Sequence, residues 1–332
     1  MKAIQFRSYG GYEEHRVVDV AEPKPAEGEA LVRMQTVGIN PLDDTLRAGK
    51  IFFATPENLP RIGGQTGVGV VTESKVGGYK SGDRVFVTGR GFGLLVDGTW
   101  REFVAAPASG LSHVPSHINN DQAAAFLAGA GYITGYLSLT EFAGFKPGQT
   151  VLAPGIGGAV GMESVQIARK LGASLAISTA TTTVKAERAR SAGYEHIVDL
   201  SRESLRDGVM RLTGGKGVDV IIDGVGGGLT GQAFGCLANG GTYVVVGYAA
   251  GRDAAINLTD IIWKAAKVRG FTLRAFSAET LAVANTTLLG YLAEGAITPM
   301  ADQVFPLGEA AAAVRHLMEG GPFGRVIMRV NG

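Results

Sequence analysis

The spacing of apolar positions along the chain predicts strands in its first third and alternating strands and helices after it. Residues 29–39 show the strand pattern most clearly, because apolar side chains alternate there with Arg33 and Gln35. The same pattern predicts strands at residues 2–6, 16–20, 82–87 and 99–106. Glycines recur within and between these strands, where they typically mark bulges or close backbone approach. We therefore expect a small, strongly curved β-rich unit.

After Asn120 the apolar spacing becomes helical and then alternates between the two periods. Strands are predicted at residues 151–153, 174–178, 196–198, 218–222, 242–246 and 267–273, with helices between them at 162–171, 184–192, 205–212 and 229–237. Strands separated by helices imply right-handed crossovers and a parallel sheet covered on both faces. Helices at 278–293 and 307–319 and a strand at 324–330 follow. The predicted fold class is α/β, with a β-rich domain wrapped around an inserted doubly wound domain.

A glycine-rich turn joins the first strand and the first helix of this α/β part. It consists of Gly155, Ile156, Gly157, Gly158, Ala159, Val160 and Gly161, and its glycines fit the spacing GxxGxxG. Glycine allows positive φ and lets the backbone approach a phosphate, while the N–H groups that begin a helix favour an anion. The turn therefore predicts a dinucleotide-binding Rossmann domain. Further candidate cofactor contacts follow later strands at Val225, Val246 and Gly247.

Composition narrows the class of protein without naming a reaction. A chain of 332 residues is long enough for two domains, and 31 basic against 30 acidic residues give no sign of nucleic-acid or membrane-surface binding. The single cysteine, Cys236, excludes an internal disulfide framework and suits a reducing compartment. The first residues, MKAIQF, lack an apolar signal core, and the apolar run at 123–139 is rich in Ala and Gly. We expect a cytoplasmic protein without a membrane partner.

Several blocks of sequence, in the same order, carry a family resemblance. They are VGINPLD at 37–43, GGQTGVGVV at 63–71, GDRV at 82–85, the stretch 151–161, GVDVIID at 217–223 and FGRVIM at 323–328. On these residues the chain resembles the medium-chain dehydrogenase/reductase superfamily, in its zinc-free quinone oxidoreductase (zeta-crystallin-like) branch. The resemblance implies a GroES-like catalytic domain at residues 1–122 and 264–332 and a Rossmann domain at 123–263. It also implies a homodimer that pairs through the strand at 267–273.

The positions of the superfamily's zinc ligands hold other residues in this chain. By resemblance, Asn40 stands where zinc-dependent members have a cysteine, and Gln65 where they have a histidine. A catalytic zinc needs His, Cys or carboxylate side chains that converge on one point. His113 and His117 have helical spacing, but Pro115 between them argues against a helix. We therefore predict no metal site.

The resemblance implies hydride transfer from NADPH to a small-molecule quinone, enone or enal. An enoyl-thioester reductase of the same family, and a catalytically weak NADPH-binding sensor or crystallin-like protein, remain alternatives. By resemblance Asn40, Asp43 and Thr134 border the nicotinamide or the substrate; a turn-capping Asn, a helix-start Asp and a helix-face Thr are the alternative readings. Phe271 and Gly324 match positions near the cofactor, although Phe271 also fits core packing. Loops at 51–60 and 89–97 are expected to wall the substrate pocket, and no proton donor is identified.

The sequence after the second predicted Rossmann strand favours NADPH over NADH. An Asp or Glu about 20 residues beyond the first glycine would bind the ribose hydroxyls and repel a 2′-phosphate. Ser178 and Thr179 stand there instead, and Lys185 and Arg188 follow with positive charge. By resemblance, Lys185 corresponds to a lysine that binds the 2′-phosphate. The alternative is that both basic residues lie on a solvated helix face of an enzyme that accepts either cofactor.

Overall fold

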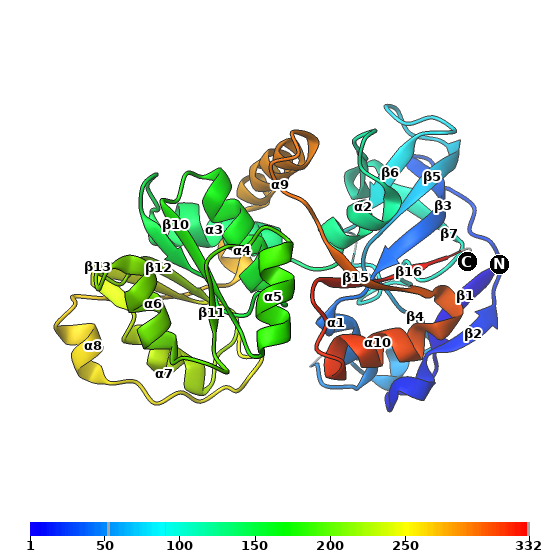
Figure 1. The fold of residues 1–332 in the computed structure, drawn as a ribbon. Coiled ribbons are helices and arrows are strands. Elements are labelled where there is room, and N and C mark those ends of the chain that lie inside the picture. Colours follow the sequence, from blue (N-terminus) through cyan, green and yellow to red (C-terminus); the bar gives the residue numbers. More distant parts are fainter. Residues whose placement is uncertain (52–53, 90, 331–332) are drawn as a thin grey trace. The chain divides into compact units, whose positions relative to one another are not determined.

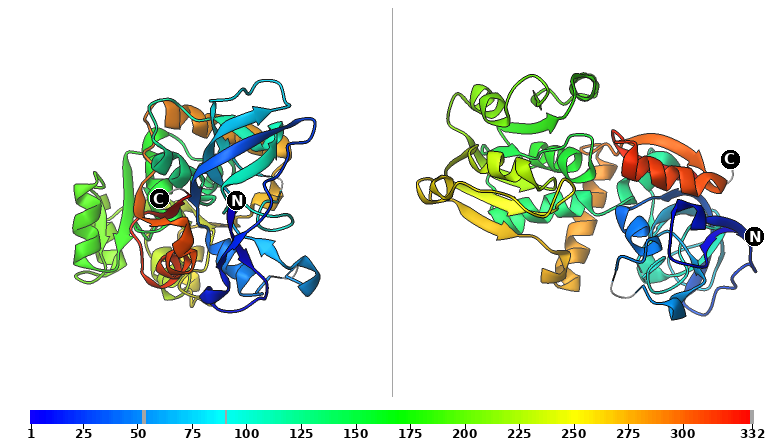
Figure 2. Two further views of the ribbon diagram at one scale, coloured as in Figure 1. Left: turned by 90° about the vertical axis from the view of Figure 1, so that its right-hand side faces the viewer. Right: turned by 90° about the horizontal axis from the view of Figure 1, so that it is seen from below.

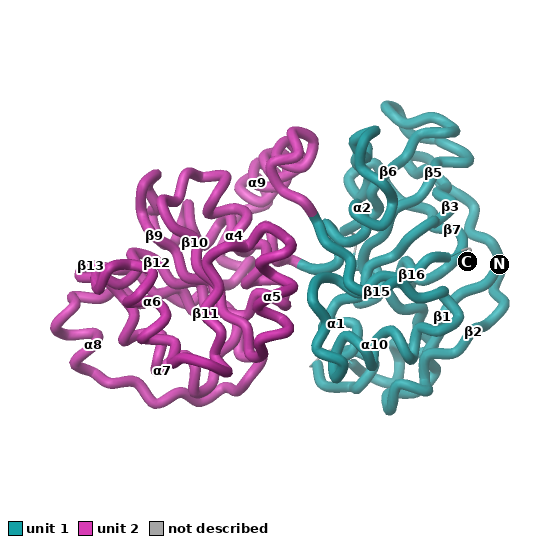
Figure 3. Tube along the Cα trace, viewed as in Figure 1, with its two compact units in different colours: residues 1–129, 299–332 teal, residues 130–298 magenta. Residues whose placement is uncertain are grey.

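The computed structural model describes residues 1–51, 54–89 and 91–330, which fold into two compact units (Figures 1 and 3). Unit 1 comprises Met1–Gly129 and Pro299–Gly332, and unit 2 comprises Ala130–Thr298. The predicted boundaries at 122/123 and 263/264 therefore need correction. The boundary at 263/264 was wrong by the larger margin. Strand β14 (Lys267–Gly270) completes the sheet of unit 2, and helix α9 (Ala278–Ala293) packs on helix α3 (Gly131–Leu137) of the same unit.

Unit 1 is built on two sheets, to which both ends of the chain contribute (Figure 2). The smaller sheet has the order β2 (Arg16–Asp19), β1 (Lys2–Phe6), β4 (Arg61–Ile62). The larger has the order β15 (Ala301–Pro306), β16 (Arg325–Arg329), β3 (Glu29–Gly38), β5 (Gly67–Ser74), β6 (Arg84–Val87), β8 (Leu111–His113), with β7 (Phe103–Pro107) on β3. Since β16 pairs with β3, with Ile327 opposite Gly38, the end of the chain is part of the sheet that carries Asn40 at its rim.

The core of unit 1 explains the alternation seen in the sequence. Val32 and Met34 of β3 are fully buried, whereas Arg33 between them is exposed. Trp100 is the largest fully buried side chain, and its indole N–H donates to the carbonyl oxygen of Gly38 at 3.0 Å. Helices α1 (Pro41–Arg47), α2 (Asn120–Leu127) and α10 (Ala310–Glu319) complete the unit. The predicted GroES-like, β-rich domain is confirmed.

Unit 2 is the predicted doubly wound domain. Its six parallel strands have the order β11 (Ile197–Asp199), β10 (Leu175–Ala180), β9 (Thr150–Leu152), β12 (Val218–Asp223), β13 (Leu237–Val245), β14. The helices are α3, α4 (Ala159–Lys170), α5 (Thr183–Ser191), α6 (Leu205–Thr213), α7 (Gly228–Phe234), α8 (Leu258–Ile262) and α9. The strand order reverses its direction between β9 and β12, where open α/β sheets bind ligands beyond the carboxyl ends of their strands.

Element boundaries differ from the predicted ones at several places. Helix α4 begins three residues before the predicted start, directly after Gly158. Helix α7 ends at Phe234 instead of Leu237, because Leu237 begins strand β13 opposite Val218. Strand β15 was not predicted, since its half-exposed residues show no alternation. His113 ends strand β8 and His117 lies in a turn, so the pair does not share a helix face.

Among the described residues, no single helix is long and apolar enough to cross a membrane. Helices α2 and α3 pass this test only together with the π-helix Ser138–Ala143, and the two parts are bent by 54° at the break between them. The apolar residues behind this result are packed inside the protein: Ala124 and Ala125 are fully buried, and Leu137 is 1% exposed.

Candidate functional site

The glycine turn between β9 and α4 forms a cradle for a phosphate. Gly155 has φ +84°, a conformation that side chains rarely adopt, and a Cβ on Gly161 would collide with the carbonyl oxygens of Pro154 and Gly155. The outer side of the turn is open, since a Cβ on Gly158 would meet nothing nearer than 3.5 Å. Ile156 is fully buried and fixes the turn to the core. The turn thus combines an inner wall that needs glycine with an outer side open to a ligand.

The start of α4 suits a negatively charged group. Gly158 is the N-cap of this twelve-residue helix, and no side chain caps the helix. The first N–H groups of a helix have no partner within it, and the helix dipole adds positive potential at this end. Ala159 and Val160 lie in this first turn and are partly exposed. The residues present therefore fit the pyrophosphate of a dinucleotide.

A buried carboxylate holds the two neighbouring turns at the same edge of the sheet. Asp223, at the end of β12, accepts through Oδ1 from the N–H groups of Val225 at 2.8 Å and Gly226 at 3.0 Å. Its Oδ2 accepts from the hydroxyls of Thr230 at 2.6 Å and Tyr243 at 2.7 Å. Burial and the charge of Asp223 both raise the pKa of Tyr243, which therefore stays a donor. Asp223 was not among the predicted site residues, although it directly follows the strand predicted at 218–222.

The backbone of Asp223 also fixes the turn after β13. Its carbonyl oxygen accepts from the N–H groups of Val246 at 2.8 Å and Gly247 at 3.1 Å. Both residues are partly exposed, as is Val225. The structure thus brings the glycine turn, Val225, Val246 and Gly247 together at the carboxyl edge of one sheet, as expected from their positions after successive strands.

The hydroxyls predicted to face a 2′-phosphate lie inside the fold. Ser178 is fully buried and its hydroxyl donates to the carbonyl oxygen of Ala153. Thr179 is 2% exposed and its Oγ1 accepts from the N–H of Gly155 at 2.9 Å. Both hydroxyls therefore support the glycine turn, and neither faces a ligand: Ser178 uses its O–H in the bond to Ala153, and Thr179 is buried. Exposed hydroxyls follow at Thr181 and Thr182.

The predicted basic residues lie on α5, directly after these threonines. Thr182 caps the helix by accepting from the N–H of Lys185 at 3.3 Å. Lys185 is half-buried, and within the part of the chain that the structure describes its ammonium group has no ion-pair partner. Arg188 lies one turn later and is exposed. The ammonium of Lys185 is thus available to an anionic ligand.

An acid that the sequence reasoning missed lies one strand away, at the end of β11. Asp199 accepts from the hydroxyls of Ser201 at 2.5 Å and Thr183 at 2.7 Å, and Arg202 lies 3.6 Å from it. These hydrogen bonds, with the charge of Arg202, lower the pKa of Asp199 below its usual range. Because its oxygens are already engaged, Asp199 anchors the start of α5 instead of replacing the ribose-binding acid. The sequence VDLS after a predicted strand was the signal available.

Asn40 and Asp43, the predicted substrate-side residues of unit 1, form a capping box at the start of α1. Asn40 Oδ1 accepts from the N–H of Leu42 at 3.0 Å, and Asp43 Oδ2 accepts from the N–H of Asn40 at 2.8 Å. Gln65 Nε2 donates to Asp43 Oδ1 at 3.1 Å. Since its oxygen is engaged in the cap, Asn40 presents Nδ2, for which the described residues offer no acceptor. The amide is therefore an oriented hydrogen-bond donor.

Asp43 is buried in this arrangement, with 5% of its surface exposed. Burial raises the pKa of its carboxyl to about 6, although the hydrogen bonds from Asn40, Gln65 and Gly64 oppose the shift. A carboxyl group with this pKa changes its charge close to neutral pH. It can therefore hold or release a proton within the range in which enzymes work.

The remaining candidates are divided between the units. Thr134 lies in α3 of unit 2 and is 5% exposed. Phe271 follows β14, is partly exposed, and packs with Phe142 and Phe276 at ring-centre distances of 5.5 and 5.9 Å. Gly324 directly precedes β16. It belongs to unit 1, as do Asn40 and Asp43. Phe52, Phe53 and Arg90, which belong to the expected pocket loops, lie outside the described residues.

Residues 1–51, 54–89 and 91–330 contain no group of three or more His, Cys, Asp or Glu side chains that could hold a metal ion. Cys236 is buried in unit 2, and burial raises the pKa of its thiol to about 12. Asn40 and Gln65 offer amides where the resembled zinc enzymes offer a thiolate and an imidazole.

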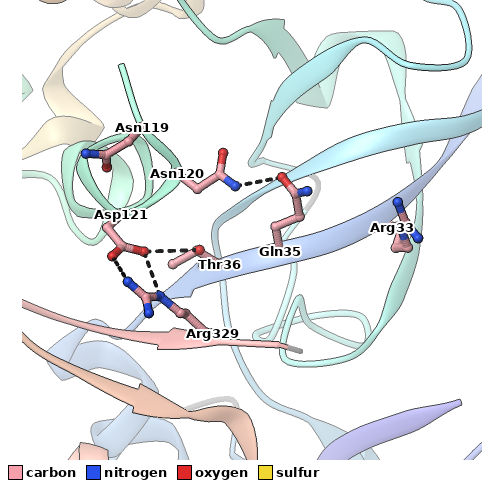
Figure 4. Close-up of a pocket in the computed structure, with 7 residues that line it drawn as sticks. All are labelled: Arg33, Gln35, Thr36, Asn119, Asn120, Asp121 and Arg329. Carbon is pink, nitrogen blue, oxygen red and sulfur yellow. Dashed lines mark hydrogen bonds and ion pairs between the residues drawn. The ribbon is translucent and has the colours of Figure 1, made fainter. Parts of the chain in front are cut away.

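A separate polar pocket of about 640 Å³ opens in unit 1 beside β3, α2 and β16 (Figure 4). It is lined by Arg33, Gln35, Thr36, Asn119, Asn120, Asp121 and Arg329. Its polar groups largely satisfy one another: Arg329 pairs with Asp121 at 2.6 Å, and Asn120 donates to Gln35 at 2.7 Å. None of the predicted site residues lines this pocket, so it is distinct from the candidate site.

Comparison with known proteins gives the same division of the chain. The model of the alcohol dehydrogenase GroES-like domain matches residues 26–116, and that of the zinc-binding dehydrogenases matches residues 159–287. A quinone oxidoreductase of Pseudomonas aeruginosa is 34% identical over 320 residues, which cover 94% of each chain.

Solved structures align over the full length. The quinone oxidoreductase of Escherichia coli, crystallised with NADPH, superimposes with a TM-score of 0.81 at 29% identity, over 99% of this chain and 100% of the other. An NAD-dependent alcohol dehydrogenase superimposes with a TM-score of 0.86 at 28% identity, over 100% of both chains. With its fold, its glycine cradle and a relative at 34% identity, this chain belongs to the medium-chain dehydrogenase/reductase superfamily, in the quinone oxidoreductase branch.

Proposed function

We propose that this protein is a zinc-independent, NADPH-dependent reductase that transfers hydride to a quinone or to an α,β-unsaturated carbonyl compound. Membership of the quinone oxidoreductase branch supports an oxidoreductase. The open glycine cradle and the uncapped start of α4 support binding of a dinucleotide. When bound, NADPH supplies the hydride, and the protein supplies binding, orientation and hydrogen bonding.

The residues after β10 support NADPH as the cofactor. The E. coli relative was crystallised with NADPH, whereas the alcohol dehydrogenase neighbour is NAD-dependent. In this chain the segment STATTT at 178–183 carries no acid to bind the ribose hydroxyls. Lys185 has an ammonium group without an ion-pair partner among the described residues, and it would bind the 2′-phosphate. The hydroxyls of Ser178 and Thr179 have no part in this proposal, since they stabilise the glycine turn.

The observation that carries the choice of reaction is the oriented amide of Asn40. A quinone or enone oxygen gains negative charge as hydride reaches the conjugated carbon, and a hydrogen-bond donor aimed at that oxygen stabilises the transition state. Asn40 Nδ2 is such a donor, and its direction is set because Oδ1 is held by Leu42 N–H. Asp43 and Gln65 hold this part of the chain in place. Water would supply the proton.

We further propose that the protein is a cytoplasmic homodimer that pairs through strand β14. This strand lies at the edge of the sheet of unit 2, and all four of its residues are exposed. Apolar side chains gather on nearby segments: Ile262 is 68% and Trp263 80% exposed, and Val268 on the strand itself is 47% exposed. An exposed edge strand with apolar neighbours favours pairing with a second copy.

The function is tested by following NADPH consumption with a panel of acceptors: a benzoquinone, a conjugated enone, a conjugated enal and an enoyl-thioester. We expect turnover with the quinone or with the enone and enal, unaffected by a metal chelator. Turnover with the enoyl-thioester alone would assign the enoyl-thioester reductase instead. NADPH binding without consumption would assign a sensor. About one tightly bound zinc per chain in elemental analysis, with activity lost to the chelator, would contradict zinc independence.

A further inference from the structure

One buried amide on α4 makes hydrogen bonds in four directions. Gln166 is 9% exposed and lies two turns beyond the glycine cradle. Its Oε1 accepts from the N–H of Thr298 at 2.7 Å and from the hydroxyl of Tyr132 at 3.3 Å. Its Nε2 donates to the hydroxyl of Tyr194 at 2.6 Å and to the carbonyl oxygen of Thr298 at 3.2 Å. A buried side-chain amide with all these bonds has a single favourable orientation.

Two of the three partners of Gln166 lie at the points where the chain passes between the units. Tyr132 is the third residue of unit 2 after the passage at 129/130, and Thr298 is its last residue before the passage at 298/299. Thr298 is held by both its N–H and its carbonyl oxygen, as a strand residue would be. A single side chain therefore fixes both connections to unit 2.

We propose that Gln166 is a positioning residue through which binding of the dinucleotide at the start of α4 restrains both connections. The proposal rests on the proposed binding of NADPH. Gln166 is eight residues beyond the N-cap Gly158, a distance of about 12 Å along a rigid helix. Contacts that fix the first turn of α4 thereby fix the amide and, through it, residues 132 and 298. Domain closure in enzymes depends on a few such connecting residues.

The third partner provides a control within the same network. Tyr194 follows α5 and does not lie at either connection. Burial raises the pKa of its phenol to about 12, so it remains protonated at working pH and its oxygen accepts the bond from Nε2. Removal of the Tyr194 hydroxyl takes one bond from Gln166 but leaves both connections bonded.

The test is backbone hydrogen exchange of the full chain with and without NADPH, together with NADPH affinity from a direct fluorescence titration and with steady-state kinetics. In the wild-type protein we expect NADPH to slow exchange at residues 130–134 and 296–300. In Gln166→Leu this NADPH-dependent protection should fall at both segments by about fivefold or more, the equivalent of one lost hydrogen bond. The dissociation constant for NADPH should change less than about twofold, while kcat falls.

Tyr132→Phe should lose the protection at 130–134 only, and Tyr194→Phe should retain it at both segments. The contrast between the two tyrosine variants tests the role of Gln166 even if Gln166→Leu fails to fold. Equal NADPH-dependent protection in wild type and Gln166→Leu, or equal losses in the two tyrosine variants, would overturn the proposal. A merely structural role would lower the melting temperature and raise exchange equally with and without NADPH. Failure of wild-type protein to bind NADPH in the titration would instead refute the proposed function.

Discussion

Asn40 and Asp43 form a reciprocal cap at the start of α1. Asn40 Oδ1 accepts from the N–H of Leu42, and Asp43 Oδ2 accepts from the N–H of Asn40. The cap does not compete with the proposed role of Asn40, because it uses only the amide oxygen. It sets the direction of the amide nitrogen. The structural and the functional readings of Asn40 are therefore compatible, and substitutions can separate them.

Asn40→Ser keeps a side-chain oxygen for the cap but removes the N–H donor. We expect kcat/KM for the quinone or enone to fall by about a hundredfold to a thousandfold, the range for loss of one hydrogen-bond donor to a developing oxyanion. The melting temperature should change little, since Ser and Asn are comparable N-caps. Asn40→Ala is the control, with the same loss of activity and about 1 kcal/mol of lost stability. Wild-type kcat/KM in Asn40→Ser would exclude the donor role.

Lys185→Ala tests the basis for choosing NADPH. The ammonium would make one charge-assisted contact with the 2′-phosphate, so the KM for NADPH should rise by an amount equivalent to roughly 1–2 kcal/mol. The KM for NADH should stay nearly unchanged. Lys216→Ala is a matched control, because Lys216 lines a pocket beside Thr150 and Asp219, at the amino ends of the strands. Equal losses with both cofactors, or a wild-type preference for NADH, would contradict the assignment.

The stability of unit 1 should depend on pH through two buried groups with opposite signs. Burial, aided by Arg47, lowers the pKa of His15 to about 4, so stability falls as pH drops from about 6.5 to 4 and the unfolded chain takes up the proton. Burial raises the pKa of Asp43 to about 6, so its contribution increases stability as pH falls from about 6 to 4. Each contribution amounts to about 3 kcal/mol.

Single substitutions should expose the two opposing contributions. In urea titrations at about pH 7 and pH 4.5, Asp43→Asn should lose more stability on acidification than wild type. His15→Gln should lose less, because the buried imidazole no longer resists protonation. His15 packs on Trp100 at a ring-centre distance of 5.3 Å, so the comparison is between pH values within each variant. The same pH dependence in both variants would show that neither group titrates as inferred.

Val268→Asp tests the dimer. The substitution places a charge on the exposed edge strand β14, and sedimentation should change from twice the 34.4 kDa chain mass to the single chain at micromolar concentration. Val283→Asp is the control: Val283 is 61% exposed, but it lies on α9. A wild-type protein that sediments only as the single chain would rule out the assembly.

The sequence predicted most of the fold, because local patterns specify most elements. Helix α9 was predicted with its observed bounds, and β3 was recognised from its alternating burial. The boundary at 298/299 was not predicted, although the strand at 267–273 was, because the packing of α9 on α3 joins segments that are distant in sequence. Asp199 and Asp223 directly follow predicted strands, a signal that was not used. Gln166 escaped notice for another reason: its role depends on hydrogen bonds to Thr298, 132 positions away, which spacing along the chain cannot reveal.

Hydrogen bonds within the protein hold the shape of the glycine turn. Gly155 N–H is bonded to the hydroxyl of Thr179, Ile156 N–H to the carbonyl oxygen of Thr179, and Gly158 N–H to that of Gly155, at 2.9 Å in each case. Folding itself orders this backbone through these three bonds, so the turn offers a dinucleotide a preorganised surface on which little backbone conformational entropy remains to be lost.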